Sequence, residues 1–394
     1  MKILLASDCY TYQINGVSRV VRSLSRGLCA MGHDVRVLAP ANSFKSFRNG
    51  ADYYIKSVPA LYYKGERFSL NLWDPLIREL TEWEPDIIHL HSEGGVALLT
   101  DRIRKKTGTP LVETVHTNYP CYIFGEKWDT PPARVIARAV GGFVYKRADC
   151  IIAPSERVRS FPYIEPLESR TTVIPNGIDP EYWKQPVSGE ERASLFNSLR
   201  FVDNGHTMIT VSRLGKEKHI QEILKALPRI AAKMPDIQFV IVGDGPIKGK
   251  LEALCKSLCI AEHVRFAGMI SPERVRSYLS MGDVFVSASN CEVHSIAYLE
   301  AMACGLPLAV KEDLSIRGVV ENGKNGFVFR NGDELVSSVL RILRDGGLRE
   351  RMRENAFLAA EAFSEKKCVE RTEALYTEVL SQMMKVGHYE ERHD

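Results

Sequence analysis

Two glutamates eight positions apart lie in the stretch of this sequence that best suits a chemical site. Glu300 belongs to a run of mostly apolar residues that predicts a short helix, beginning near Ser295 and ending at Gly305. A carboxylate in apolar surroundings needs a partner, which the hydroxyls of a ligand could supply. Glu292 precedes the helix, so we expect its carboxylate to project from a loop toward the same ligand.

The start of this predicted helix is a candidate phosphate site. The first amides of a helix have no partner within the helix and carry partial positive charge. Here they belong to His294, Ser295 and Ile296. We expect these amides to contact a phosphate group.

Two cations follow a predicted strand over residues 207–212. They are Arg213 and Lys218. Parallel sheets bind ligands beyond the carboxyl ends of their strands. An arginine binds a diphosphate with two N–H groups and a lysine adds a point charge, so the pair fits a diphosphate. A solvated charged turn is the alternative.

Two glycine-containing turns also follow predicted strands. Gly243 begins a run that nearly matches a dinucleotide fingerprint, but its last glycine is one residue late and no acidic residue clearly ends a following strand. A nicotinamide enzyme is therefore a poor interpretation. Gly16 opens a helix after the first strand, where the backbone can approach an anion closely. A plain strand-to-helix turn explains Gly16 equally well.

The elements that must position these residues alternate between strands and helices. Repeated units of this kind form mostly parallel sheets with helices on both faces. The pattern pauses in a polar segment that ends near residue 205 and then restarts, which predicts two doubly wound α/β halves with a ligand cleft between them. The predicted strands are residues 2–7, 35–38, 87–91, 111–116, 150–155, 171–174, 207–212, 237–242, 264–267, 284–286 and 307–310.

The ordered set of motifs resembles the retaining family-4 glycosyltransferases. Its core is Glu-x7-Glu followed by Ala-Met-Ala-x-Gly-x-Pro, and the resemblance covers residues 2–365. The supporting motifs come in the family's order: Asn15-Gly16, residues 85–91 (Pro-Asp-Ile-Ile-His-Leu-His), residues 175–179, residues 212–214 with Lys218, and residues 242–246.

The resemblance implies the GT-B fold, with two Rossmann-like doubly wound domains that face a central cleft. Residues 1–178 would form the acceptor-side domain, 179–205 a linker and 206–365 the nucleotide-sugar-binding domain. Residues 366–394 would form a helix that returns to the first domain, and a tail. Family members need no metal, and no cofactor is expected beyond the nucleotide-sugar co-substrate.

The resemblance also implies roles for single residues. Arg213 and Lys218 would hold the donor diphosphate, and Glu300 the ribose hydroxyls. Glu292 would support positive charge on the transferred sugar. His116 would contact that sugar from the first domain, where Gly16 would approach the donor phosphates.

One departure from the family concerns the residues that follow Glu292. Many members carry Gly-Phe-Gly there, whereas this sequence has Val293, His294 and Ser295. The change bears on the identity of the donor sugar. His294 is better explained as a satisfied structural histidine than as a catalytic one.

The run from His116 to Tyr119, with Tyr122 after it, looks like the His-Thr-x-Tyr-x-x-Tyr run of bacterial diacylglycerol glucosyltransferases, which dock on membranes. Arg134 and Arg138 lie in a basic amphipathic stretch that could contact an anionic membrane. A core-facing helix with a solvated basic face is the alternative.

Composition limits the remaining classes of function. A formal charge of +3 excludes nucleic-acid binding through bulk charge. Nine scattered cysteines favour reduced thiols, and no spacing suggests zinc. The resemblance implies an enzyme that moves glucose from a UDP-sugar to a lipid such as diacylglycerol. With the reduced thiols, it leads us to expect a cytoplasmic enzyme that is peripheral on the inner face of the plasma membrane. The alternatives are surface-polysaccharide or lipopolysaccharide assembly, nucleotide-sugar epimerisation and a non-catalytic nucleotide-sugar sensor.

Overall fold

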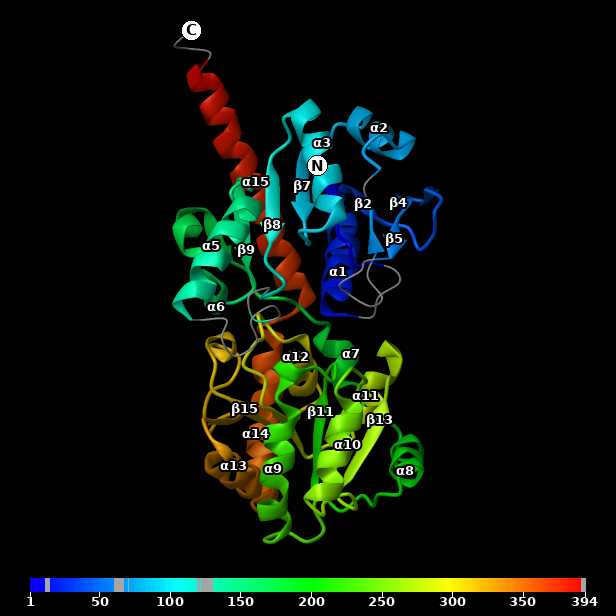
Figure 1. The fold of residues 1–394 in the computed structure, drawn as a ribbon, viewed down its shortest axis with the longest axis vertical. Coiled ribbons are helices and arrows are strands. Elements are labelled where there is room, and N and C mark those ends of the chain that lie inside the picture. Colours follow the sequence, from blue (N-terminus) through cyan, green and yellow to red (C-terminus); the bar gives the residue numbers. More distant parts are fainter. Residues whose placement is uncertain (11–14, 60–66, 70, 119–120, 122–129, 391–394) are drawn as a thin grey trace. The chain divides into compact units, whose positions relative to one another are not determined.

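The computed structural model describes residues 1–10, 15–59, 67–69, 71–118, 121 and 130–390. The chain forms two compact units (Figure 1). Unit 1 comprises Met1–Pro120, Lys127–Gly177 and Glu365–Asp394, and unit 2 comprises Cys121–Glu126 and Ile178–Ser364. No helix in these described ranges is both long enough and apolar enough to cross a bilayer.

Unit 1 is built on an eight-stranded sheet in the order β10-β9-β8-β7-β1-β2-β4-β3. Every neighbouring pair is parallel except the edge pair β3–β4. A small antiparallel pair, β5–β6, accompanies it. The strands are β1 (Lys2–Ala6), β2 (Asp34–Pro40), β3 (Phe47–Asn49), β4 (Asp52–Ile55), β5 (Val58–Pro59), β6 (Arg67–Phe68), β7 (Ile87–Leu90), β8 (Leu111–Thr114), β9 (Cys150–Ala153) and β10 (Thr171–Val173).

Helices cover both faces of this sheet, because its central strands are apolar on both sides. One core lies between the sheet, α1 and α15, and another between the sheet, α2 and α3. The helices are α1 (Gly16–Ala30), α2 (Pro75–Glu82), α3 (Gly95–Thr107), α5 (Pro131–Tyr145), α6 (Glu156–Arg159) and α15 (Glu365–Glu390), with the 3₁₀ helix η2 (Glu165–Arg170).

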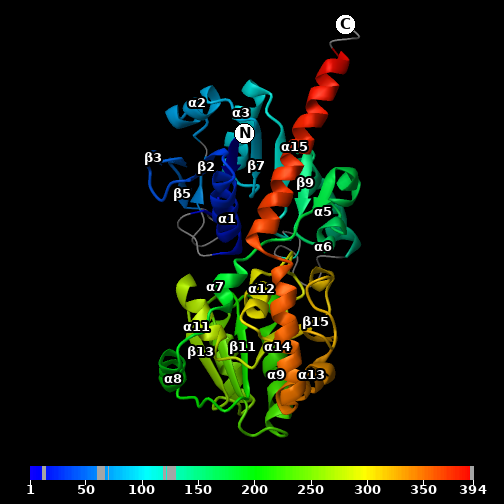
Figure 2. The ribbon, with the colours of Figure 1, turned by 180° about the vertical axis from the view of Figure 1, so that it is seen from behind.

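The C-terminal helix α15 belongs to unit 1 although it follows unit 2 in the chain. It lies against α1 (Figure 2) and contributes Val369, Leu375, Tyr376 and Val379 to the core on that face. The hydroxyl of Tyr376 is 2.5 Å from Nδ1 of His89 on β7. The helix therefore returns to the first domain, as the fold predicted from the sequence requires.

Unit 2 has a fully parallel six-stranded sheet in the order β13-β12-β11-β14-β15-β16. Two apolar cores, one on each face, hold its helices. The strands are β11 (Thr207–Val211), β12 (Gln238–Val242), β13 (Val264–Gly268), β14 (Val284–Ser287), β15 (Leu308–Lys311) and β16 (Gly326–Phe329). The helices are α7 (Pro180–Lys184), α8 (Gly189–Ser198), α9 (Ile220–Ala231), α10 (Lys248–Ser257), α11 (Val275–Leu279), α12 (Ile296–Ala303), α13 (Gly332–Arg344) and α14 (Gly346–Glu361), with the 3₁₀ helices η3 (Lys216–Lys218), η4 (Pro272–Arg274) and η5 (Leu314–Ile316).

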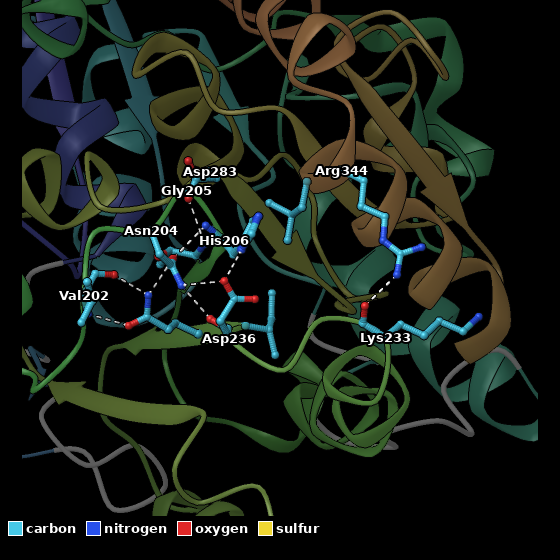
Figure 3. A network of polar contacts seen from close by, with 12 residues as sticks. Val202, Asn204, Gly205, His206, Lys233, Asp236, Asp283 and Arg344 are labelled. Atoms are coloured by element: carbon cyan, nitrogen blue, oxygen red, sulfur yellow. Dashed lines mark hydrogen bonds and ion pairs between the residues drawn. The ribbon is translucent and has the colours of Figure 1, made fainter.

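The segment expected to be a linker, residues 179–205, is an ordered part of unit 2. It forms α7 and α8, and Trp183, Leu195 and Phe196 are buried in one of the two cores. Its end is tied to the sheet by a polar network (Figure 3), in which Asn204 donates to the carbonyl oxygen of Asp236 at 2.8 Å. The segment is therefore not a linker between the units, because a few apolar residues on two short helices anchor it to unit 2.

Two cysteines depart from the expectation of reduced thiols. Cys121 and Cys291 form a disulfide within unit 2, with their Cα atoms 6.3 Å apart. The other seven cysteines form no disulfide. The two residues are 170 positions apart, so only the folded chain brings them together.

Candidate functional site

Two charged side chains from different loops of unit 2 meet directly. Nζ of Lys218 donates to Oε1 of Glu292 at 2.6 Å. Lys218 ends η3, which follows β11, and Glu292 lies between β14 and α12. Strands β11 and β14 are parallel neighbours, so both loops leave the carboxyl edge of the sheet. The side chains are 18% and 15% exposed, which leaves the pair partly accessible to a ligand.

Arg213 has a carboxylate partner of its own. Its Nη2 donates to Oε1 of Glu217 at 3.3 Å. Glu217 is only 12% exposed, whereas Arg213 is 49% exposed. A Cβ atom on Gly215 would lie 2.1 Å from Oε1 of Glu217, so this conformation needs glycine at that position. Each of the two predicted diphosphate ligands is thus paired with a carboxylate.

Glu300 is 3% exposed and lies in α12, where residues 298–303 are all buried. The helix begins at Ile296, one residue after the predicted start, and Ser295 is its N-cap residue. The side chain of Ser295 makes no capping hydrogen bond to this helix. The amides at its start are therefore not occupied by the Ser295 hydroxyl, as a phosphate site would require.

His294 is buried against the ring of Phe363, with the centroids 5.5 Å apart. Burial lowers its pKa to about 4, so the imidazole is neutral at pH 7. A buried, neutral ring against an aromatic side chain favours a structural role.

Gly243 directly follows β12 and packs closely against the loop that follows β11. Its φ is +126°, and a Cβ atom there would lie 1.9 Å from the carbonyl oxygen of Ser212. A side chain cannot be placed at this position without moving the backbone next to Arg213. The glycine therefore sets the close approach of two loops at the carboxyl edge of the sheet.

In unit 1, His116 follows β8 and contacts a second histidine. Nε2 of His116 lies 3.0 Å from Nδ1 of His91, which follows the neighbouring strand β7. A third histidine, His89, is bonded by Thr114 at 2.7 Å and by Tyr376 at 2.5 Å. Burial lowers the pKa of His116 to about 4 and that of His89 to about 3. All three side chains belong to unit 1.

Gly16 is the exposed first residue of α1 in unit 1. Its helix start carries a capping box, in which the amide of Ser18 donates to Oδ1 of Asn15 at 2.9 Å. This local bond occupies one of the amides that an anion would use.

The predicted acceptor and membrane residues are only partly described. Tyr119 and Tyr122 lie outside the described residues. Arg134 and Arg138 are on α5, and both form ion pairs with Glu165, at 2.9 Å and 3.3 Å. Their charge is thus partly balanced.

Two residues at these sites were missed in the sequence. Glu217 stands between two lysines, a pattern that by itself indicates a solvated charged turn. His91 belongs to a motif of the family resemblance but received no role. Its spacing from His89 was the available signal, since residues two apart on a strand share a face.

Comparison with known proteins identifies the family. Residues 14–182 match the model described as Glycosyltransferase Family 4, and residues 191–358 match the one described as Glycosyl transferases group 1. The chain belongs to glycosyltransferase family 4. It is a retaining hexosyltransferase of that family.

Curated relatives and solved structures agree with this family. Alpha-monoglucosyldiacylglycerol synthase of Acholeplasma laidlawii is 27% identical over 96% of this chain and 98% of its own length. The enzyme of the same name from Streptococcus pneumoniae is 28% identical over 87% of this chain and 78% of its own length. The structure of Anabaena Alr3699/HepE in complex with UDP-glucose has a TM-score of 0.74 at 19% identity, covering 97% of this chain and 100% of that chain. The fold of the family-4 chain is therefore GT-B.

Proposed function

We propose that this glycosyltransferase moves glucose from UDP-glucose to diacylglycerol or a closely related membrane lipid, with retention of anomeric configuration. The contact between Lys218 and Glu292 carries the donor side of the proposal, because it joins a diphosphate cation to a carboxylate suited to a cationic sugar. The acceptor side is supported by the two relatives named for monoglucosyldiacylglycerol synthesis.

Each donor residue has a role that follows from its chemistry. Arg213 and Lys218 neutralise the charge that builds on the departing diphosphate. Glu292 stabilises the positive charge that develops on the sugar as its bond to UDP breaks. Glu300, buried on α12, accepts hydrogen bonds from the ribose hydroxyls. His116 contacts the transferred sugar, and Gly16 leaves room for the donor phosphates.

Neither cation is unpaired before the donor binds. Glu292 neutralises Lys218 and Glu217 neutralises Arg213, so both lie among carboxylates at distances of 2.6 Å and 3.3 Å. A bound diphosphate replaces these contacts with stronger ones to two adjacent negative groups. When Lys218 turns to the diphosphate, the Glu292 carboxylate is released for the sugar.

We further propose that unit 1 contacts an anionic membrane through α5. Val135 and Ile136 on this helix are 69% and 50% exposed. A pocket of about 510 Å³ is lined in part by Arg138 of the same helix, together with Lys146, Tyr163 and Glu165. Exposed apolar residues beside basic ones suit the interface of an anionic leaflet, and the cytoplasmic leaflet is the one with that charge.

The test is a transfer assay on the full chain with radiolabelled UDP-glucose and phosphatidylglycerol vesicles, with or without diacylglycerol. We expect label in a lipid product only when diacylglycerol is present. Label in a polyprenyl-linked or water-soluble acceptor instead would indicate polysaccharide or lipopolysaccharide assembly. Conversion of UDP-N-acetylglucosamine without an acceptor would indicate an epimerase, and UDP binding without turnover a sensor.

Sedimentation with the same vesicles tests the membrane contact. The variant Val135→Ser/Ile136→Ser should bind the vesicles less than wild type, and Leu358→Ser, on an exposed site of unit 2, should bind as wild type does. Equal binding of all three proteins would contradict a contact through α5.

A further inference from the structure

Three histidines lie in contact at the carboxyl edge of the sheet in unit 1, and only His116 has a role in the proposed function. His89 is on β7 and His91 directly follows it, so the backbone directs both side chains to one face. Their ring centroids are 4.0 Å apart. The amide of His91 donates to the carbonyl oxygen of Ala6 at 2.8 Å, which fixes its backbone. His91 is therefore a rigid neighbour of His116.

The hydrogen bond between His91 and His116 joins two neutral rings. Burial lowers the pKa of His116 to about 4 and that of His91 well below its ordinary value. A neutral imidazole has one N–H and one bare nitrogen. The 3.0 Å contact between Nδ1 of His91 and Nε2 of His116 therefore contains a single proton, and one ring must donate while the other accepts.

The surroundings of His91 decide which ring donates. Its Nε2 is buried and, among the described residues, none bonds it. If His116 donated, His91 would carry its own proton on that nitrogen, as a buried N–H without an acceptor. If His91 donates from Nδ1, its Nε2 is a bare acceptor. Buried N–H groups without partners are rarer than under-satisfied acceptors, so donation by His91 is favoured.

We propose that His91 is a positioning residue that holds His116 in the tautomer protonated on Nδ1, so that His116 offers a hydrogen-bond donor to the sugar. The proposal rests on the proposed function for the ligand of His116. It has a mechanistic consequence. With Nε2 occupied by His91 and Nδ1 already protonated, neutral His116 has no free lone pair, so it orients a sugar hydroxyl and does not take a proton from the acceptor.

His89 supplies a matched control. Both of its ring nitrogens are bonded, by Tyr376 and Thr114, so neither nitrogen takes part in the bond between His91 and His116. His89→Leu removes a buried imidazole next to His91 but leaves the bond between His91 and His116 in place. Any loss that is common to His89→Leu and His91→Leu reports on packing rather than on the tautomer.

The experiment compares four variants of the full chain. An asparagine amide reaches the place of Nδ1 and a glutamine amide that of Nε2, so His91→Asn keeps the donor to His116 and His91→Gln does not. We expect kcat for glucosyl transfer to fall about tenfold or more in His91→Leu and His91→Gln, the loss of one hydrogen bond to a group near developing charge. The KM for UDP-glucose should stay unchanged. His91→Asn and His89→Leu should stay within about twofold of wild type.

A second readout does not need activity. In ¹⁵N-histidine-labelled full chain, the ring nitrogens of His116 are assigned by their absence in His116→Gln. We expect the proton on Nδ1 in wild type and in His91→Asn, and a shift toward Nε2 in His91→Gln. A proton on Nε2 of His116 in wild type, or equal kcat in folded His91→Asn and His91→Gln, would overturn the proposal. If wild type transfers no glucose, the proposed function fails and the ring spectrum alone decides the tautomer.

Discussion

Glu217 accepts a hydrogen bond from Arg213, four residues before it in the chain, with 3.3 Å between Nη2 of Arg213 and Oε1 of Glu217. The carboxylate is 12% exposed and lies over Gly215. In the proposed function Arg213 binds the two negative phosphates of the donor, so Glu217 would compete with the donor for Arg213. On this proposal, nucleotide binding would have to overcome the attraction between Arg213 and Glu217.

Glu217→Gln should bind UDP about three- to tenfold more tightly than wild type, because the neutral amide holds Arg213 less strongly and repels the diphosphate less. Isothermal titration calorimetry measures the affinity. Glu321→Gln, which removes the same charge from an exposed ion pair with Lys324, should bind as wild type does. Weaker UDP binding by Glu217→Gln would mean that Glu217 orders the loop rather than competing.

Glu292→Gln should lower kcat for transfer by about 100-fold or more, because in the proposed function this carboxylate stabilises the charge that develops on the sugar. The same change removes the partner of Lys218, so UDP should bind equally or more tightly. Initial rates and UDP titrations on one preparation separate the two effects. Wild-type turnover by the folded variant would exclude Glu292 from the chemistry.

Gly243→Ala should lower the free energy of unfolding by about 2 kcal/mol or more, because φ is +126° and an added Cβ atom would lie 1.9 Å from the carbonyl oxygen of Ser212. The affinity for UDP should also fall, because the displaced backbone at Ser212 is next to Arg213. Gly249→Ala is the control, since Gly249 is in α10 and a Cβ atom there meets nothing within 4 Å. That change should be neutral or stabilise by about 1 kcal/mol. Urea unfolding of both variants checks the difference.

Asp8 should make stability depend on pH. Burial raises its pKa from 3.8 to about 7, while its carboxylate accepts bonds from the Val96 amide and the Ser92 hydroxyl. The folded state then binds the proton more tightly than the unfolded state. This contribution to stability is therefore present at low pH and is lost as pH rises from about 4 to about 7.

Asp8→Asn removes this titration and keeps an acceptor for the Val96 amide. Its melting temperature relative to wild type should rise by a few degrees between pH 5 and pH 8. The difference from wild type is the quantity to measure, because the buried histidines act in the opposite direction as pH falls. Asp333→Asn, at an 81% exposed site, should give a constant difference. A constant difference for Asp8→Asn as well would contradict the raised pKa.

The local patterns of the sequence predicted much of the fold. Buried strands such as Ile87–Leu90 and helices such as Ile220–Ala231 were found because their apolar residues repeat along a short stretch of chain. The segment 179–205 was not found, because α7 and α8 are short and their anchors, such as Trp183, are widely spaced. The disulfide between Cys121 and Cys291 was not predicted, because no local spacing connects them.

What the sequence determined alone was the set of residues that follow strands, among them Arg213, Lys218 and Glu292, since strand and turn signals are local. Only the tertiary structure decided which of these ends are neighbours. Strand order put β11 beside β14, and so Lys218 against Glu292. Burial decided the protonation of His91 and His116, because the cost of a charge depends on atoms that are distant in the chain.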